Sequence, residues 1–167
     1  MLPLPEKPAF DAGNPAPYYV AAAQIYNALR GCGAENPLCI AALANADMES
    51  AFKPAAIGDS DQAFSLWQWH WLSRGSRILA ATGIDVRHET SIRKIVAALW
   101  WELNNVFPGA LMQLRAAPSY EDAAAIFCKL IEGAGAPDAS ARRVLDAQFW
   151  GAFVATHADF LAEHPAL

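Results

Sequence analysis

The chain has 167 residues, of which 54% are hydrophobic and 17% are charged, and its formal net charge is -5. This composition predicts one folded domain and excludes an intrinsically disordered chain. Nucleic acid is not expected as a partner, because phosphate contacts need clustered Lys and Arg and the sequence has no such cluster. Membrane insertion is not expected either, because no stretch approaches roughly 18 uninterrupted apolar residues.

The N-terminal stretch "MLPLPEKPAFDAGNPAP" is rich in proline and has no apolar run that could form the core of a signal peptide. We therefore expect an extended arm over residues 1–14 and a single domain over residues 15–167. With no signal peptide, synthesis in the cytoplasm is expected, followed by a route other than standard export.

Two helices are predicted next. "NPAPYYVAAAQIYNALRGCG" has proline near its start and glycines at its end, as is typical of a helix. "NPLCIAALANADMES" repeats the pattern, with Asn36 expected as the N-cap and Pro37 in the first turn. This second segment is apolar on all sides, so it should be the buried central helix. Glu49 falls at its C-terminal end.

Between Phe52 and Trp69 the helical period fails, and turn formers such as Pro54, Gly58 and Ser60 predict a small β-hairpin lobe. Helical patterns resume at residues 72–82, 91–106, 108–116, 119–132 and 138–164. The expected fold class is therefore mainly α (α+β), with six to seven helices and one small β element.

Cys32, Cys39 and Cys128 form no CxxC pair. They are interpreted as buried apolar side chains, although a Cys32–Cys39 disulfide stays open because spacing alone cannot settle it. No metal and no cofactor are expected, since the sequence has neither an HExxH motif nor a Gly-rich phosphate loop. The histidines are scattered, at His70, His88, His157 and His164.

Glu49 is the first candidate for catalysis. A carboxylate at the C-terminal end of a buried helix faces the negative end of the helix dipole and loses solvation, and both effects are expected to raise its pKa. A carboxyl that stays protonated near neutral pH can act as a general acid. The alternative is a solvated residue at a helix end.

Trp67, Trp69 and Trp71 alternate along the chain and could face one side of an extended segment. Indole faces stack well on sugar rings, so we expect one of these tryptophans to line a groove, with core packing as the alternative for at least two. Asp59 and Asp61 lie in a turn, where the alternative role is that of an Asx-turn residue. The functional interpretation of Asp59 is a base that positions water, and Asp61 has a weaker case.

"MESAFKPAAIGDSDQAFSLWQWH" resembles the phage-tail lysozyme family of the lysozyme-like superfamily. The family string has a Glu-Ser pair, a Gly-Asp turn and a segment with a small residue, Leu, any residue, Gln and Trp. The layout is also similar to goose-type lysozymes and soluble lytic transglycosylases. The likeness extends from about residue 20 to residue 150 and includes "AALWWEL" and "AAAIFCKLIEGAGAPDASARR". It implies a lysozyme-like fold.

Carried over residue by residue, the resemblance makes Glu49 the catalytic acid and places Gln68 in the substrate cleft. Of two water-positioning aspartates in goose-type lysozymes, the first matches Asp59 and the second falls on His70, which is a departure. A further departure is Ser65, where the family usually has Gly. The expected substrate-binding residues are Asp61, Ser65, Trp67, Gln68, Trp69 and His70. Glu132 is interpreted as structural or as part of the groove rim.

The resemblance implies cleavage of the β-1,4 bond between N-acetylmuramic acid and N-acetylglucosamine in peptidoglycan. If Asp59 stands about 6.5–9.5 Å from Glu49, an inverting hydrolase is expected. If Asp59 points elsewhere, the muramoyl 6-hydroxyl attacks instead, which is lytic transglycosylase chemistry. A non-catalytic glycan-binding component of a phage tail or secretion apparatus, and a purely structural helical domain, are further alternatives.

The expected partners are peptidoglycan glycan strands, and also phage-tail or other particle proteins. We expect a monomer that acts on the cell wall or travels on a phage-like particle.

Overall fold

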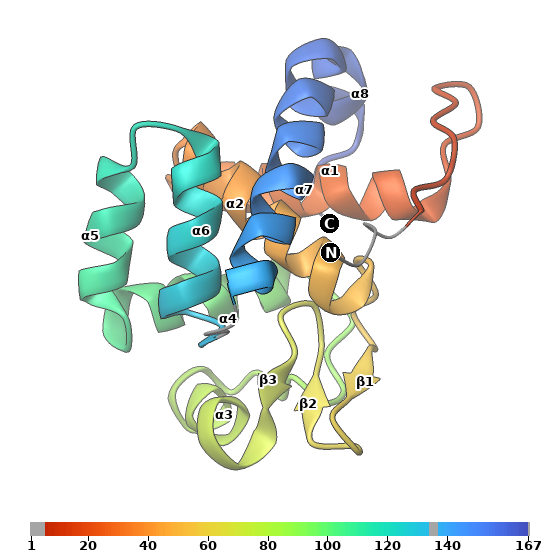
Figure 1. Cartoon of the computed structure of the whole chain (residues 1–167). Coiled ribbons are helices and arrows are strands. Elements are labelled where there is room, and N and C mark those ends of the chain that lie inside the picture. Colours follow the sequence, from red (N-terminus) through yellow and green to blue (C-terminus); the bar gives the residue numbers. More distant parts are fainter. Residues whose placement is uncertain (1–5, 134–136, 167) are drawn as a thin grey trace.

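The computed structural model describes residues 6–133 and 137–166. In chain order the elements are α1 (Pro17–Gly31), α2 (Asn36–Ser50), β1 (Ile57–Gly58), β2 (Ala63–Phe64), β3 (Trp69–His70), the π-helical turn η1 (Trp71–Gly75), α3 (Ser76–Thr82), α4 (Ile92–Asn105), α5 (Pro108–Ala116), α6 (Tyr120–Leu130), α7 (Pro137–Thr156) and α8 (Ala158–Glu163). The helices form one body, and the three strands with η1 and α3 form a smaller lobe below it (Figure 1). The predicted class, mainly α with a small β element, is confirmed.

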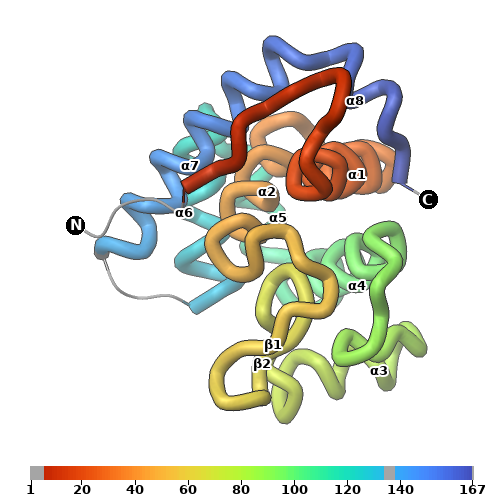
Figure 2. The backbone as a smooth tube through the Cα atoms, turned by 90° about the vertical axis from the view of Figure 1, so that its right-hand side faces the viewer, coloured from red at the N-terminus to blue at the C-terminus, as the bar shows by residue number. Residues whose placement is uncertain are grey.

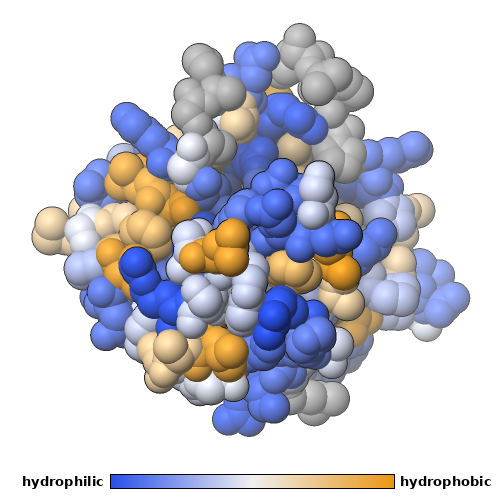
Figure 3. Space-filling model, turned by 90° about the horizontal axis from the view of Figure 1, so that it is seen from below, coloured by the Kyte–Doolittle hydropathy of each residue, from blue (hydrophilic) through white to orange (hydrophobic). Residues whose placement is uncertain are grey.

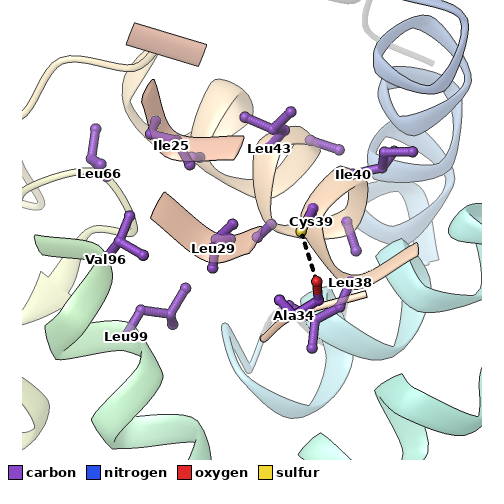
Figure 4. Close-up of a cluster of buried hydrophobic side chains, with 14 of the residues drawn as sticks. Ile25, Leu29, Ala34, Leu38, Cys39, Ile40, Leu43, Leu66, Val96 and Leu99 are labelled. Carbon is purple, nitrogen blue, oxygen red and sulfur yellow. Dashed lines mark hydrogen bonds between the residues drawn. The ribbon is translucent and has the colours of Figure 1, made fainter. Parts of the chain in front are cut away.

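Helix α2 lies at the centre of the helical body, as its all-round apolar sequence predicts. It packs against α1, α5, α6 and α7, and its residues from Leu38 to Asp47 are all buried. Around Cys39, Figure 4 shows aliphatic side chains from several elements turned toward one another. Cys39 Sγ lies 3.7 Å from Ala34 O, its hydrogen-bond acceptor.

The three cysteines are free thiols. Cys39 and Cys128 are buried and Cys32 is half-buried, so the expectation of small apolar side chains holds for the first two. Burial raises the pKa of the Cys39 thiol to about 12. The Cys32–Cys39 disulfide, left open by the sequence, is not formed.

Local sequence explains most helix boundaries. The hydroxyl of Ser119 accepts a hydrogen bond from Asp122 N at 3.1 Å and caps α6, as its SYED sequence predicts. At α2 the expected cap is wrong by one residue. Asn36 is the first helical residue, and its Oδ1 is occupied by the Tyr26 hydroxyl, while Glu35 takes the N-cap position without a side-chain bond.

Two predicted helices differ in detail. The segment expected as one helix over residues 72–82 begins as the π-helical turn η1 and becomes regular only at Ser76. The segment expected over 138–164 is divided at His157, whose ψ of 41° interrupts the helix between α7 and α8. The described residues therefore form eight α-helices rather than six or seven.

Residues 6–14 of the predicted arm pack against the helices. The Phe10 ring makes edge contacts with Tyr19 of α1, Phe153 of α7 and Phe160 of α8, at centroid distances of 5.0–5.1 Å. Figure 2 shows this segment beside these helices. Residues 1–5 lie outside the described part of the chain.

The lobe is a three-stranded antiparallel sheet in the order β1-β2-β3, in which Phe64 is paired with both Ile57 and Trp69. Seen from below, the molecule presents a largely hydrophilic face with separate apolar patches (Figure 3). Ile57 and Leu72 are the most exposed large apolar side chains of the lobe, at 59% and 79%. In the described ranges, no helix combines the length and apolar character needed to cross a membrane.

Candidate active site

A pocket of about 360 Å³ lies where the lobe meets the helical body. Its walls come from the end of α2, from the lobe, from η1 and from the segment after α6. The lining residues are Glu49, Asp59, Ala63, Gln68, His70, Arg74 and Glu132. Five of the seven are titratable, and four of the residues expected from the sequence, Glu49, Asp59, Gln68 and His70, are among them.

Glu49 is the residue before the last in α2, and its side chain is 25% exposed. Its carboxylate forms an ion pair with Arg143 Nη2 of α7. The apolar surroundings expected for Glu49 are therefore replaced in part by a buried cation. A general acid has to carry a proton when it reacts, so this ion pair has to break before Glu49 can act as one.

The backbone around Glu49 reverses sharply. Helix α2 ends because Ala51 adopts a left-handed conformation, with φ of 48°. In the described residues, every non-glycine residue with positive φ lies between positions 51 and 68, namely Ala51, Phe52, Asp59, Ser60, Asp61, Ser65 and Gln68. Such conformations cost free energy and cluster at functional sites. The strain here is confined to the segment that builds the pocket.

Ser50 ties this segment to α2. Its hydroxyl oxygen lies 2.9 Å from Ala46 O and 3.0 Å from Leu66 O, within reach of its single proton. Ser50 is buried, so its role next to Glu49 is to anchor the loop that carries Gln68.

Gln68 lies opposite Gly58. A Cβ atom at Gly58 would lie 2.3 Å from Gln68 Oε1, so any other residue at position 58 would displace the end of the Gln68 side chain. The amide nitrogen of Gln68 donates to Ser65 O at 3.0 Å, which orients the side chain along the pocket wall.

Ser65 is not in the pocket lining, so its expected role in substrate binding is not supported. Its side chain is 1% exposed, and its φ is 70°. A left-handed φ favours glycine, which is the residue that the family usually has at this position. The effect of having Ser instead of Gly at position 65 is therefore on backbone strain, and not on the access of a substrate.

Asp59 and His70 meet at the open side of the pocket. His70 Nε2 lies 3.0 Å from Asp59 Oδ2, and the two side chains are 40% and 68% exposed. His70 stands at the position of the second water-positioning aspartate of goose-type lysozymes. It is thus the partner of Asp59, which stands at the position of the first. Asp61 is exposed in the neighbouring turn and does not line the pocket, so its expected role in substrate binding is not supported.

The expectation that Trp67 or Trp69 lines a groove is wrong, because both side chains are fully buried. Trp67 Nε1 donates to Ala42 O of α2 at 3.1 Å, and Trp69 Nε1 donates to Glu102 Oε2 of α4 at 2.9 Å. The alternating spacing does not separate faces here, since Gln68 has a left-handed φ of 47° and the segment is not a regular strand. Trp71 is half-buried, with the Arg87 guanidinium 3.5 Å from its ring centroid.

Arg74 links the lobe to the helical body. Its Nε and Nη2 donate to the two carboxylate oxygens of Glu102 at 2.7 Å each, a bidentate pair. Its Nη1 lies 3.6 Å from Glu132 Oε2. Glu102 is 1% exposed and also accepts from Trp69, so its charge is fully satisfied.

From the sequence, Glu132 was interpreted as structural or as part of the groove rim, and in the structure it lines the pocket itself. Its side chain is 6% exposed, and its Oε1 has no hydrogen-bond partner within residues 6–133 and 137–166. Burial, opposed by Arg74, raises the pKa of this carboxyl to about 8. Glu132 is therefore a buried carboxyl that holds a proton near neutral pH, on a different element from Glu49.

The described residues contain no group of three His, Cys, Asp or Glu side chains placed to hold a metal ion. Compared with known proteins, residues 20–153 match the family model described as phage tail lysozyme. No curated protein and no solved structure matches the chain. The matched range contains every residue of the pocket and both guanidiniums that contact its carboxyl groups.

Proposed function

Because the chain belongs to the phage tail lysozyme family and so has a peptidoglycan-lytic, lysozyme-like function, we propose that it is a muramidase that cleaves the β-1,4 bond between N-acetylmuramic acid and N-acetylglucosamine. The observation that carries this proposal is the pocket between lobe and body, which gathers Glu49, Asp59, Gln68 and His70 of one short segment and adds Glu132 from a distant one. Two carboxyl groups in one open pocket are what glycoside hydrolysis needs.

In this proposal, Glu49 protonates the oxygen of the leaving sugar, and Asp59 accepts a proton from the attacking water. The His70 ring beside Asp59 orients that carboxylate, since their polar atoms are 3.0 Å apart. Gln68, held by Ser65 O and accommodated by Gly58, hydrogen-bonds the sugar. The ion pair between Arg143 and Glu49 has to break, so that Glu49 can contact the substrate, before the proton is transferred.

The exposure of Asp59 keeps lytic transglycosylase chemistry as the second candidate. A carboxylate that is 68% exposed in a turn can point away from the glycan. The muramoyl 6-hydroxyl would then attack the anomeric carbon and give a 1,6-anhydro product, with Glu49 as the single carboxyl.

Digestion of purified Gram-negative peptidoglycan, with muropeptides read by mass spectrometry, tests the proposal. We expect reducing-end products from the wild type and a rate about 10²–10⁴-fold lower for Glu49→Gln, which preserves shape but cannot donate the proton. For Asp59→Asn we expect about a 100-fold loss. Products lighter by one water, with Asp59→Asn as active as the wild type, would replace the muramidase by a transglycosylase. Full activity of Glu49→Gln would remove Glu49 from either mechanism.

We also propose that the protein reaches the cell wall on a phage-like particle. The family supports an association with phage tails, and the acidic chain, with a pI near 5.3, gives no electrostatic attraction to anionic surfaces. Co-purification with tail proteins from particles would support this route, and its exclusive presence in the lysate supernatant would contradict it.

A further inference from the structure

The pocket contains more carboxyl groups than cations to balance them. The charged groups that act on Glu132 come from every element around it: Arg74 of η1, Glu102 of α4, Glu49 of α2 and Arg143 of α7. Cys128 of α6 is also coupled to it, with a pKa raised by burial, and Asp59 and His70 lie across the pocket. Arg74 and Arg143 thus face three carboxyl groups, Glu49, Glu102 and Glu132.

Two of the three carboxyl groups are committed to a cation in the structure. Glu102 has the bidentate contact with Arg74, and Glu49 has the ion pair with Arg143. Glu132 has only the longer contact to Arg74, at 3.6 Å, and its other oxygen is buried without a partner. A third buried negative charge would be uncompensated, so Glu132 holds a proton at neutral pH.

We propose that Glu132 is a positioning residue that shares one proton with Glu49 and keeps it available to that acid. When the substrate displaces Arg143 from Glu49, the O–H bond of the Glu132 carboxyl breaks and its proton passes to the Glu49 carboxylate, directly or through a water in the pocket. Glu132 becomes the carboxylate and is stabilised by Arg74, while Glu49 becomes the neutral acid. This inference rests on the proposed role of Glu49.

Sharing has a thermodynamic consequence. Two coupled carboxyl groups titrate as a pair, and in this pair the proton available to Glu49 is the one that Glu132 holds. The raised pKa of Glu132, about 8, indicates where the last proton leaves. Glu132 therefore extends the range of pH in which the pocket can protonate a leaving group.

The first test is the pH dependence of kcat/KM for peptidoglycan cleavage by the wild type and by Glu132→Gln. The variant keeps the shape of the side chain but holds no transferable proton. We expect its alkaline limb to move at least one pH unit lower, which is about a tenfold loss of activity on that limb, with activity preserved at lower pH. A merely structural role would leave the limb in place, and an unchanged profile overturns the proposal. Glu163→Gln, an exposed residue of α8, is the matched control.

The second test needs no turnover. In a protein labelled with ¹³C at the glutamate carboxyls, NMR should show one carboxyl titrating near pH 8 that disappears in Glu132→Gln. In Glu49→Gln its pKa should fall, because the negative charge of Glu49 raises it. Absence of such a carboxyl, or a titration that Glu49→Gln leaves unchanged, overturns the sharing. If Glu49→Gln still cleaves peptidoglycan, the proposed function fails instead, whatever the titration shows.

Discussion

Two clusters of charged groups lie at the same end of α2, and they begin only two residues apart, at Asp47 and Glu49. The Asp47 cluster, which comprises Lys7, Tyr18, Asp47, Asp146 and Trp150, has a cation at its centre, and Tyr18 and Asp47 also line a pocket of about 960 Å³. Lys7 Nζ bonds both carboxylates, and the exposed fractions of the Asp47 and Asp146 side chains are 1% and 0%. Tyr18 Oη donates to Asp47 at 2.5 Å, and Trp150 Nε1 is shared between the two aspartates at 3.2 Å.

The Glu49 cluster, which comprises Glu49, Arg74, Glu102, Glu132 and Arg143, differs in the exposure of its carboxyl groups and in how closely cations contact them. Each cluster borders a pocket and has one buried carboxylate oxygen without a partner among the described residues, Asp47 Oδ1 and Glu132 Oε1. In the Glu49 cluster, however, the Glu49 side chain is 25% exposed, and within the described ranges the only ion pair of Glu132 is the 3.6 Å contact to Arg74. Bonds from Lys7, Tyr18 and Trp150 hold the two aspartates of the Asp47 cluster together. In the Glu49 cluster, Glu132 lacks such a close cation and Glu49 is accessible from the pocket, so this cluster is placed to exchange a proton with a ligand. The comparison suggests that α2 supports stability through Asp47 and chemistry through Glu49.

Removing the central cation should break the Asp47 cluster. Lys7→Met leaves two buried carboxyl groups facing each other without their cation. We expect a loss of about 3–5 kcal/mol in the free energy of unfolding, the usual consequence of breaking a buried ion pair. Urea unfolding measures the loss, and Lys129→Met, at an exposed position on α6, should change it by less than about 0.5 kcal/mol. An equal effect of both substitutions would show that the cluster adds little stability.

Trp69→Ala tests the boundary of the Glu49 cluster. The indole is fully buried and donates to Glu102, so its removal leaves a cavity and an acceptor with one bond fewer. We expect a loss of about 3 kcal/mol in stability. Binding of chitooligosaccharides by the folded variant should be retained, because the ring does not reach the pocket. Calorimetry of binding beside thermal unfolding checks this, and weak binding with normal stability would place Trp69 in the groove after all.

The most gradual effect is the pH dependence of stability that Glu132 contributes. Its pKa is raised in the folded protein, so folding favours the protonated form, and the stabilisation is complete below the pKa of the unfolded chain, about 4.3. It is lost progressively as the pH rises to about 8, at a slope of at most about 1.4 kcal/mol per pH unit. Glu132→Gln should remove this decline, which urea unfolding at pH 5, 6.5 and 8 would reveal. Parallel curves for the wild type and the variant would contradict it.

The sequence predicted the scaffold well for physical reasons that are local. The all-round apolar run of α2 identified the buried helix, and the turn formers between Pro54 and Asp61 identified the lobe. The serine caps and the proline starts located most helix boundaries. Errors arose where tertiary contacts decide, as in the π-helical turn at Trp71 and the break at His157.

The site was predicted in part. Glu49, Asp59, Gln68 and His70 share one pocket because the motif carries them in a single short segment. Trp67 and Trp69 were misjudged because a period of two holds only in regular strands, and left-handed residues interrupt this one. Glu132 was underestimated because it lies 83 residues after Glu49 in the sequence. Its protonation depends on burial, on Arg74 and on the charges of residues from α2, α4 and α7, which no local pattern contains.

The comparison of the two clusters rests most directly on one paired measurement, the rate of peptidoglycan cleavage and the midpoint of unfolding for Glu49→Gln and Asp47→Asn. We expect Glu49→Gln to lose about 10²–10⁴-fold in rate with an unchanged midpoint, because the amide removes only the transferable proton. Asp47→Asn should lower the midpoint, while the folded enzyme cleaves at the wild-type rate. Turnover by Glu49→Gln at the wild-type rate would contradict this account, and so would loss of turnover in a well-folded Asp47→Asn.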